Sequence, residues 1–155
     1  MIAGAKYRHT NLVALDWRSL ARFYAQVFGC ELAPPERDLA GAAFERGTAI
    51  AGARAWGVHL RLPGGGEDGP TLEIFQYEPP ALHAPSAVNQ PGFAHIAFQV
   101  DSVASAQAEV IAAGGAAVGE VVTTTIATGE EITWCYVRDP EGNIIELQST
   151  RETSG

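Results

Sequence analysis

The segment HTNLVALDWRSLARFYAQVFG (9–29) has a counterpart in HIAFQVDSVASAQAEVIAAG (95–114). Each segment begins with a histidine in a short strand-like run and continues through an aspartate into apolar residues at helical spacing. Asp16 and Asp101 suit the N-cap position, because a short acidic side chain accepts hydrogen bonds from the free N–H groups of the first turn. The closing glycine suits the left-handed position that ends a helix. The chain therefore carries a strand–helix unit twice.

Three further runs with strand character follow each strand–helix unit. The final runs match each other best, with LEIF (72–75) in the first half and IELQ (145–148) in the second. A Pro- and Ala-rich segment between the halves is typical of a linker. These patterns predict an α+β fold with two tandem βαβββ modules, which share a cupped mixed sheet with the helices outside. The predicted strands are 42–50, 56–62, 71–77, 121–127, 132–137 and 143–149, in a single domain (1–155) with modules at 7–77 and 93–149 and a linker at 78–92.

The composition limits the kinds of partner. The chain has 155 residues, of which 46% are hydrophobic and 18% are charged, and this balance is typical of a globular protein. A net charge of −8 with scattered basic residues argues against nucleic acid as a partner. We expect no membrane partner, because no apolar stretch reaches the length of a membrane span. With no signal-peptide pattern at the N-terminus, the default expectation is a cytoplasmic protein with free, buried cysteines.

Two histidines and two glutamates occupy equivalent positions in the predicted modules: His9, Glu73, His95 and Glu146. Strand alternation sends their apolar neighbours to the helix side and these four side chains to the other face. Two carboxylates in one concavity would repel each other unless a cation neutralised them. Imidazole and carboxylate ligands together suit Zn, Ni, Co, Mn or Fe, so we predict one divalent transition metal. The alternative is four polar residues on a solvated sheet.

Several other side chains are predicted to face the same cavity by alternation: His59, Arg61, Phe75, Trp134 and Tyr136. His59 is interpreted either as a second acid–base group or anchor for an anionic substrate, or as a hydrogen-bonded sheet histidine. The three aromatic residues form either a wall of the substrate pocket or ordinary core packing.

Three stretches carry a family resemblance. GFAHIAFQVDS (92–102) and VRDPEGNIIELQ (137–148) resemble the opening and closing strands of the second module in the vicinal oxygen chelate superfamily, and HTNLVALD (9–16) resembles the opening of its first module. This superfamily includes glyoxalase I, methylmalonyl-CoA epimerase, extradiol dioxygenases and bleomycin-binding proteins. The resemblance covers about residues 7–149. It implies the paired βαβββ fold and, for many members, a metal-dependent reaction.

The ligand pattern is most similar to that of glyoxalase I-like lyases and isomerases. By that resemblance His9 and His95 are ligands only, Glu146 is the first candidate for the base, and Glu73 is its partner. Tyr136 matches a position that lines the substrate pocket in such members. The reaction implied is removal of a proton next to a metal-chelated carbonyl or hydroxyl of a small oxygenated substrate. The resemblance also implies a homodimer.

Two other functions fit the same sequence. A binding protein that confers antibiotic resistance would stack a planar ligand on Trp134 and Tyr136 without turnover. An extradiol-type dioxygenase would use Fe(II), with Glu73 off the metal.

Overall fold

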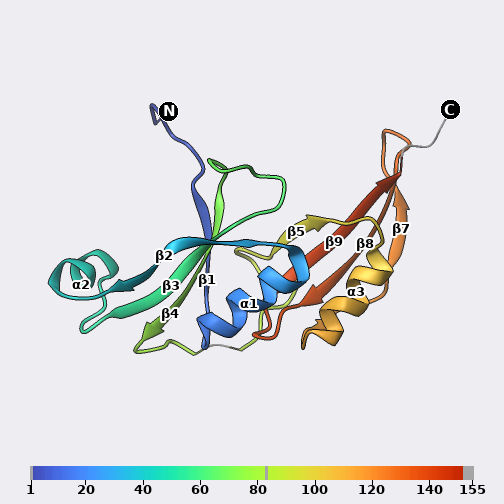
Figure 1. Ribbon diagram of the computed structural model, residues 1–155. Helices are drawn as coiled ribbons and strands as arrows, with labels where there is room; N and C mark the ends of the chain where they lie inside the picture. The colour runs from blue at the N-terminus through green and yellow to red at the C-terminus, as the bar shows by residue number, and fades with distance from the viewer. Residues whose placement is uncertain (1, 83, 152–155) are drawn as a thin grey trace. The chain divides into compact units, whose positions relative to one another are not determined.

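Each half of the chain begins with the predicted strand and helix (Figure 1). Three strands and a second, short helix follow in the first half, and four strands follow in the second. The computed structural model describes residues 2–82 and 84–151. By their internal contacts the residues divide into two units, Met1–Leu82 (unit 1) and His83–Gly155 (unit 2). The boundary lies in the segment predicted as a linker, whose His83 is outside the described residues. Two mixed sheets built from βαβββ modules confirm the predicted fold class.

Unit 1 contains a four-stranded sheet in the order β1-β4-β3-β2. Strands β1 and β4 are parallel, and the other neighbours are antiparallel. Helix α1 packs on β3 and β4. The elements are β1 (His9–Val13), α1 (Trp17–Phe28), β2 (Glu31–Leu39), α2 (Ala42–Thr48), β3 (Arg54–Arg61) and β4 (Thr71–Glu78).

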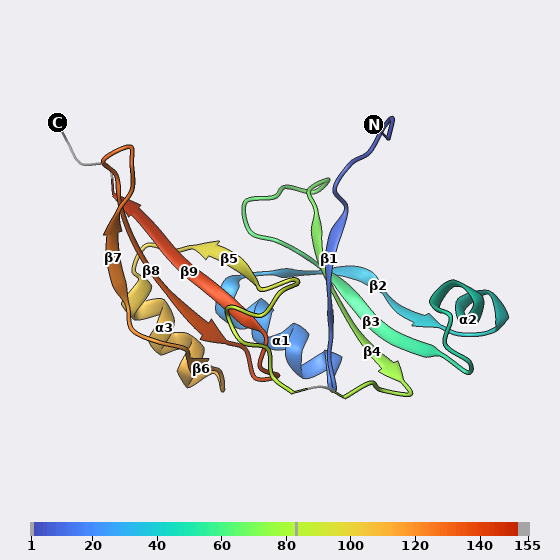
Figure 2. The same ribbon diagram turned by 180° about the vertical axis from the view of Figure 1, so that it is seen from behind.

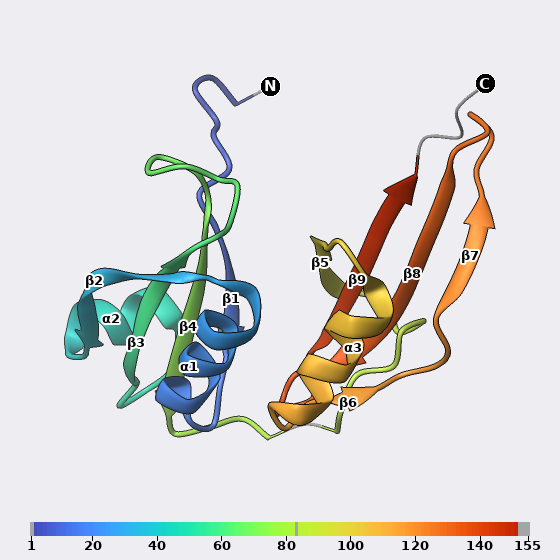
Figure 3. The same cartoon turned by 45° about the vertical axis from the view of Figure 1, so that its right-hand side comes forward.

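Unit 2 repeats this plan with the order β5-β9-β8-β6, and β7 also pairs with β8 (Figure 2). Strands β5 and β9 are parallel, as β1 and β4 are in unit 1. Helix α3 packs on β8 and β9 (Figure 3). No helix in the described part of the chain is long and apolar enough to cross a membrane. The elements are β5 (His95–Gln99), α3 (Val103–Ala112), β6 (Ala116–Ala117), β7 (Val122–Thr125), β8 (Glu131–Arg138) and β9 (Ile144–Arg151).

The two cores lie between each helix and its sheet, as the strand alternation predicts. Leu72 and Ile74 of β4 and Ile145 and Leu147 of β9 are almost fully buried. The residues between them point to the opposite face of each sheet, away from α1 in unit 1 and from α3 in unit 2. That face, called the open face below, carries Glu73 in unit 1 and Glu146 in unit 2.

Helices α1 and α3 have side-chain caps, but one cap differs from the prediction. Asp16 accepts hydrogen bonds from the backbone N–H groups of Arg18 and Ser19, as expected. The N-cap of α3 is Ser102 and not Asp101, because the helix begins at Val103 and the Ser102 hydroxyl accepts from the N–H of Ser105. Serine caps a helix about as well as aspartate does, so Ser102 can take this position in place of its neighbour.

The predicted strand at 42–50 is wrong, since this segment contains helix α2. Ala42, Ala43 and Glu45 are strong helix formers, which favours the observed conformation. The strand that pairs with β3 is β2, which contains Pro34 and Pro35. Proline is tolerated there because β2 is an edge strand, and its register with β3 shifts between Ala33 and Arg37.

The DPEGN segment between β8 and β9 forms a turn organised by Asp139, which is 3% exposed. One carboxylate oxygen accepts hydrogen bonds from the backbone N–H groups of Glu141 and Asn143, at 2.9 and 3.0 Å. The other oxygen accepts from the Asn143 side chain at 2.8 Å. Asp139 thus fixes the hairpin that leads into β9, the strand that carries Glu146.

We predict that Asp139→Ala lowers the free energy of unfolding by about 1–3 kcal/mol, because it leaves buried N–H groups without an acceptor. Asp139→Asn should cost less, since its amide oxygen can still accept from both backbone donors. Urea denaturation of the two variants measures the difference. Equal losses would show that the backbone hydrogen bonds are not the stabilising contribution.

Candidate metal centre

Three strands of unit 1 bring His9, His59 and Glu73 together on the open face. Antiparallel pairing of β3 with β4 sets His59 directly opposite Glu73. The His59 Nε2 atom lies 2.9 Å from Glu73 Oε1, and His9 Nε2 lies 3.6 Å from Glu73 Oε2. One ligand atom from each residue can be chosen so that all lie within 4.8 Å of one another. Glu73 occupies the centre because β4 runs between β1 and β3.

Polar neighbours hold two of these side chains in place. The amide of Asn11 donates a hydrogen bond to Glu73 Oε2 at 2.8 Å. His59 Nδ1 lies 2.8 Å from the hydroxyl oxygen of Thr71. Metal-binding histidines generally use one ring nitrogen for such a contact and the other for the metal. The Thr71 contact therefore leaves His59 Nε2 directed at the carboxylate of Glu73.

The protonation of His59 also suits a ligand. Burial lowers the pKa of His59, because a partly buried ring is less stable in its charged form. The negative charge of Glu73 acts in the opposite direction, while the positive charges of His9, Arg37 and Arg8 add to the lowering. His59 is therefore mainly neutral at neutral pH, with a ring lone pair available to a cation. Two imidazoles and one carboxylate fit a borderline divalent metal.

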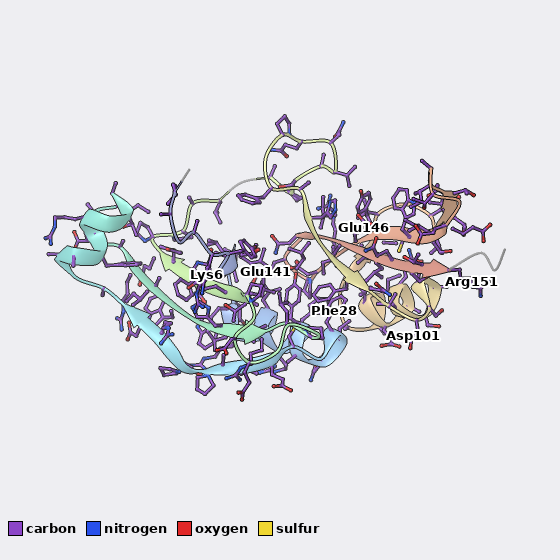
Figure 4. All side chains as sticks on the ribbon, turned by 90° about the horizontal axis from the view of Figure 1, so that it is seen from above. Lys6, Phe28, Asp101, Glu141, Glu146 and Arg151 are labelled. Carbon is purple, nitrogen blue, oxygen red and sulfur yellow. The ribbon has the colours of Figure 1, made fainter. Side chains whose placement is uncertain are left out.

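Unit 2 holds the second predicted pair. His95 Nε2 lies 3.0 Å from Glu146 Oε2, and both side chains are partly exposed. Glu146 extends from β9 (Figure 4). Within the described residues of unit 2, no third metal-ligating side chain completes a group like that of unit 1. The four predicted ligands thus form two pairs, one in each unit, and their shared binding of one cation stays a prediction.

Trp134 and Tyr136 lie beside the unit 2 pair. Their rings make a near-perpendicular contact with centroids 5.3 Å apart, and Tyr136 also lies 5.1 Å from the His95 ring. A pocket of about 180 Å³ adjoins them. It is lined by Thr124, Ile132, Trp134, Tyr136, Glu146 and Gln148.

The remaining predicted pocket residues, Phe75 and Arg61, belong to unit 1. Phe75 is buried, and its ring makes an edge contact with His59 at a centroid distance of 6.4 Å. A Cβ atom at Gly57 would collide with this ring, so the glycine permits Phe75 to lie across β3 beside His59. Arg61 ends β3 and pairs with Thr71. A single wall made by Phe75, Trp134 and Tyr136 stays a prediction, because these residues belong to different units.

The grouping of His59 with His9 and Glu73 was missed in the sequence. Alternation places His59 on the correct face, but it does not give the register between neighbouring strands. The feature that could have revealed this grouping is the hairpin of β3 and β4. Pairing Arg61 with Thr71 in that hairpin sets His59 opposite Glu73. The glycine-rich loop between these strands is too long to fix that pairing from turn chemistry alone.

Comparison with known proteins agrees with this architecture. The model of the Glyoxalase/Bleomycin resistance protein/Dioxygenase superfamily matches residues 6–147. The structure is similar to that of a glyoxalase family protein from Bacillus cereus, with 20% identity, a TM-score of 0.75, and coverage of 98% of this chain and 100% of the other. A glyoxalase family protein from Enterococcus faecalis is 21% identical, with a TM-score of 0.59 and coverage of 95% and 99%.

A virulence protein from Salmonella typhimurium is 26% identical, with a TM-score of 0.51 and coverage of 96% of this chain and 98% of the other. No match was found among curated proteins. The likeness to the Bacillus and Enterococcus proteins shows the fold alone, so the chemistry has to be argued from the side chains.

We predict about one divalent transition metal per chain in protein purified without chelator. His59→Ala and Glu73→Ala should lose most of it, because each removes a ligand. Thr71→Val should weaken metal affinity by about 10–100-fold, since it removes only the group that orients His59. Elemental analysis and metal titration measure these effects.

Thr123→Val is the matched control, because the Thr123 hydroxyl contacts Thr133 in unit 2 and should not affect the centre. His95→Ala tests the four-ligand prediction separately. Unchanged metal content in His95→Ala would show that the unit 2 pair does not bind this cation, and unchanged content in His59→Ala would show that His59 is no ligand.

Proposed function

The chain belongs to the glyoxalase/bleomycin resistance protein/dioxygenase superfamily, and we propose that it is a divalent-metal-dependent enzyme of the glyoxalase I or epimerase type. It would remove a proton next to a metal-chelated carbonyl or hydroxyl group of a small oxygenated substrate. The observation that carries this proposal is the convergence of His9, His59 and Glu73. A bound metal would supply positive charge to the chelated oxygens and so make the neighbouring C–H group more acidic.

Glu146 is the better candidate for the base. Both oxygens of Glu73 already have partners, because Oε1 faces His59 and Oε2 faces Asn11 and His9. Among the described residues, the ion pair of Glu146 is with His95 alone, through Oε2. Its other oxygen is therefore better placed to accept a proton. A carboxylate base needs a fixed position, and the contact with His95 restrains the side chain of Glu146.

The pocket beside Glu146 supports the same assignment. The rings of Trp134 and Tyr136 offer apolar surface next to a carboxylate. Apolar walls exclude part of the water and strengthen the electrostatic interactions of the reacting groups. Ile132 adds to this surface, while Thr124 accepts a hydrogen bond from the indole N–H of Trp134 at 3.3 Å.

We predict that Glu146→Gln slows solvent-deuterium exchange at the α-carbon of an α-hydroxy or α-keto substrate by about 10²–10⁴-fold, because an amide cannot take the proton. NMR of metal-loaded protein with such compounds measures the exchange. Glu146→Asp is the matched variant, because it keeps a carboxylate and should retain part of the exchange. Exchange at the wild-type rate in Glu146→Gln would rule out Glu146 as the base.

The three candidate ligands, His9, His59 and Glu73, also fit a second function. Two histidines and one carboxylate are the ligands of many non-haem iron oxygenases, so an extradiol-type dioxygenase is the main alternative. Oxygen uptake with a catechol panel and Fe(II), in the absence of deuterium exchange, would support it. Ligand-induced thermal stabilisation without turnover under any metal would support an antibiotic-binding protein that uses the Trp134 pocket.

We also propose a homodimer. Strands β1 and β5 each lie at an edge of their sheet. Val13, which ends β1, and Leu15, just after it, are 58% and 62% exposed. Exposed edge strands with apolar side chains favour pairing with another chain. A symmetric dimer is the commonest assembly of this kind.

Light scattering coupled to size-exclusion chromatography should give twice the chain mass at micromolar concentration. Val13→Lys should shift the protein toward monomer, because it places a charge at the contact. Ile111→Lys, on the exposed side of α3, is the control. A monomeric wild type across this concentration range would contradict the proposal.

A further inference from the structure

Charged residues on β2 are sorted between the two faces of the unit 1 sheet. Glu36 accepts two hydrogen bonds from the guanidinium of Arg18 on α1, each 2.8 Å long. Asp38 accepts two from Arg54, at 3.0 and 2.8 Å. Glu36 therefore lies on the helix side of the sheet, and alternation puts Asp38 on that side too. Arg37, between them, points to the open face.

The strand register places Arg37 near the candidate metal centre. Arg37 pairs with Gly57 on β3, and Gly57 lies two residues from His59 on the same side of that strand. A Cβ atom at Gly57 would collide with the ring of Phe75, so this ring covers Gly57 beside Arg37 on the open face. The positive charge of Arg37 also acts on His59, and among the arginines it has the largest effect there. Arg37 is half-buried, whereas Arg18 and Arg54 are exposed.

The Arg37 guanidinium has no anionic partner among residues 2–82 and 84–151. Within the described residues, Arg37 forms no ion pair, although Arg18 and Arg54 each hold a carboxylate with two hydrogen bonds. Glu73 is already engaged by His9, His59 and Asn11. A partly buried guanidinium without a counter-ion is unfavourable, and its planar fork matches a carboxylate or phosphate group.

We propose that Arg37 binds an anionic group of the substrate, a carboxylate or a phosphate, beside the centre formed by His9, His59 and Glu73. The inference rests on the proposed function and narrows it. The substrate class is a small oxygenated acid with one set of neighbouring oxygens for the metal and a second, anionic group for Arg37. Arg37 is thus a residue that determines specificity and takes no part in proton transfer.

Binding of three α-hydroxy acids to zinc-loaded protein tests this inference by isothermal titration calorimetry. Lactate offers only the chelating oxygens, malate adds a second carboxylate, and phosphoglycerate adds a phosphate. Wild-type protein should bind malate or phosphoglycerate about 10–100-fold more tightly than lactate, the usual range for hydrogen bonds between charged groups. The tighter of the two identifies the anionic group.

Arg37→Gln should abolish this preference and leave lactate affinity unchanged, while Arg37→Lys should retain part of it. Arg18→Gln and Arg54→Gln are the matched controls, because their guanidinium groups hold carboxylates on the helix side. Circular dichroism verifies that each variant is folded.

The outcomes separate the two proposals. Equal affinities for the three acids in wild-type protein, or an unchanged preference in folded Arg37→Gln, would overturn the role of Arg37 while leaving the metal centre intact. Failure of wild-type protein to bind zinc would overturn the proposed function, and the role of Arg37 would fall with it.

Discussion

The candidate centre depends on one carboxylate held on a central strand with an open face. Glu73 lies on β4 between β1 and β3, so histidines from both neighbours reach it without a loop contributing a ligand. Leu72 and Ile74, on either side of it, are buried under α1. Rotating β4 to release Glu73 would expose both of these residues to water, at about 1.5–3 kcal/mol each. Core packing thus holds the centre in place.

Because each strand of unit 1 has one buried face, the position of a charged residue along the strand determines which partners it can reach. Because each strand has one face toward a helix, acidic residues on the helix side obtain arginine partners there, as Glu36 does from Arg18. The open face keeps a different set, with Glu73 shared between histidines and Arg37 left without a carboxylate. A protein with a net charge of −8 therefore places one arginine on the same face as its candidate centre. This arrangement favours an anionic ligand, even though the chain as a whole repels one.

Unit 2 repeats the strand and helix arrangement of unit 1 with different side chains on its open face. His95 and Glu146 correspond in position to His9 and Glu73, but unit 2 has an aromatic pair, Trp134 and Tyr136, beside its glutamate. The repeat therefore supplies equivalent backbone positions while the side chains differ in role. Unit 1 has the richer set of metal ligands, and unit 2 has the less constrained carboxylate and an adjoining pocket.

The sequence by itself determined the two βαβββ modules, the helix boundaries around Asp16 and the face of each strand on which the histidines and glutamates lie. These features depend on residue spacing within one element, which periodicity reads directly. The sequence pattern did not predict α2, because helix propensity outweighed an apparent strand pattern in 42–50. It also did not predict that the proline-containing segment β2 is a strand. Only the tertiary structure decided which residues meet across strands, because register depends on loop closure and core packing far from the paired residues. The pairing of His59 with Glu73, and that of Arg37 with Gly57, are both consequences of register.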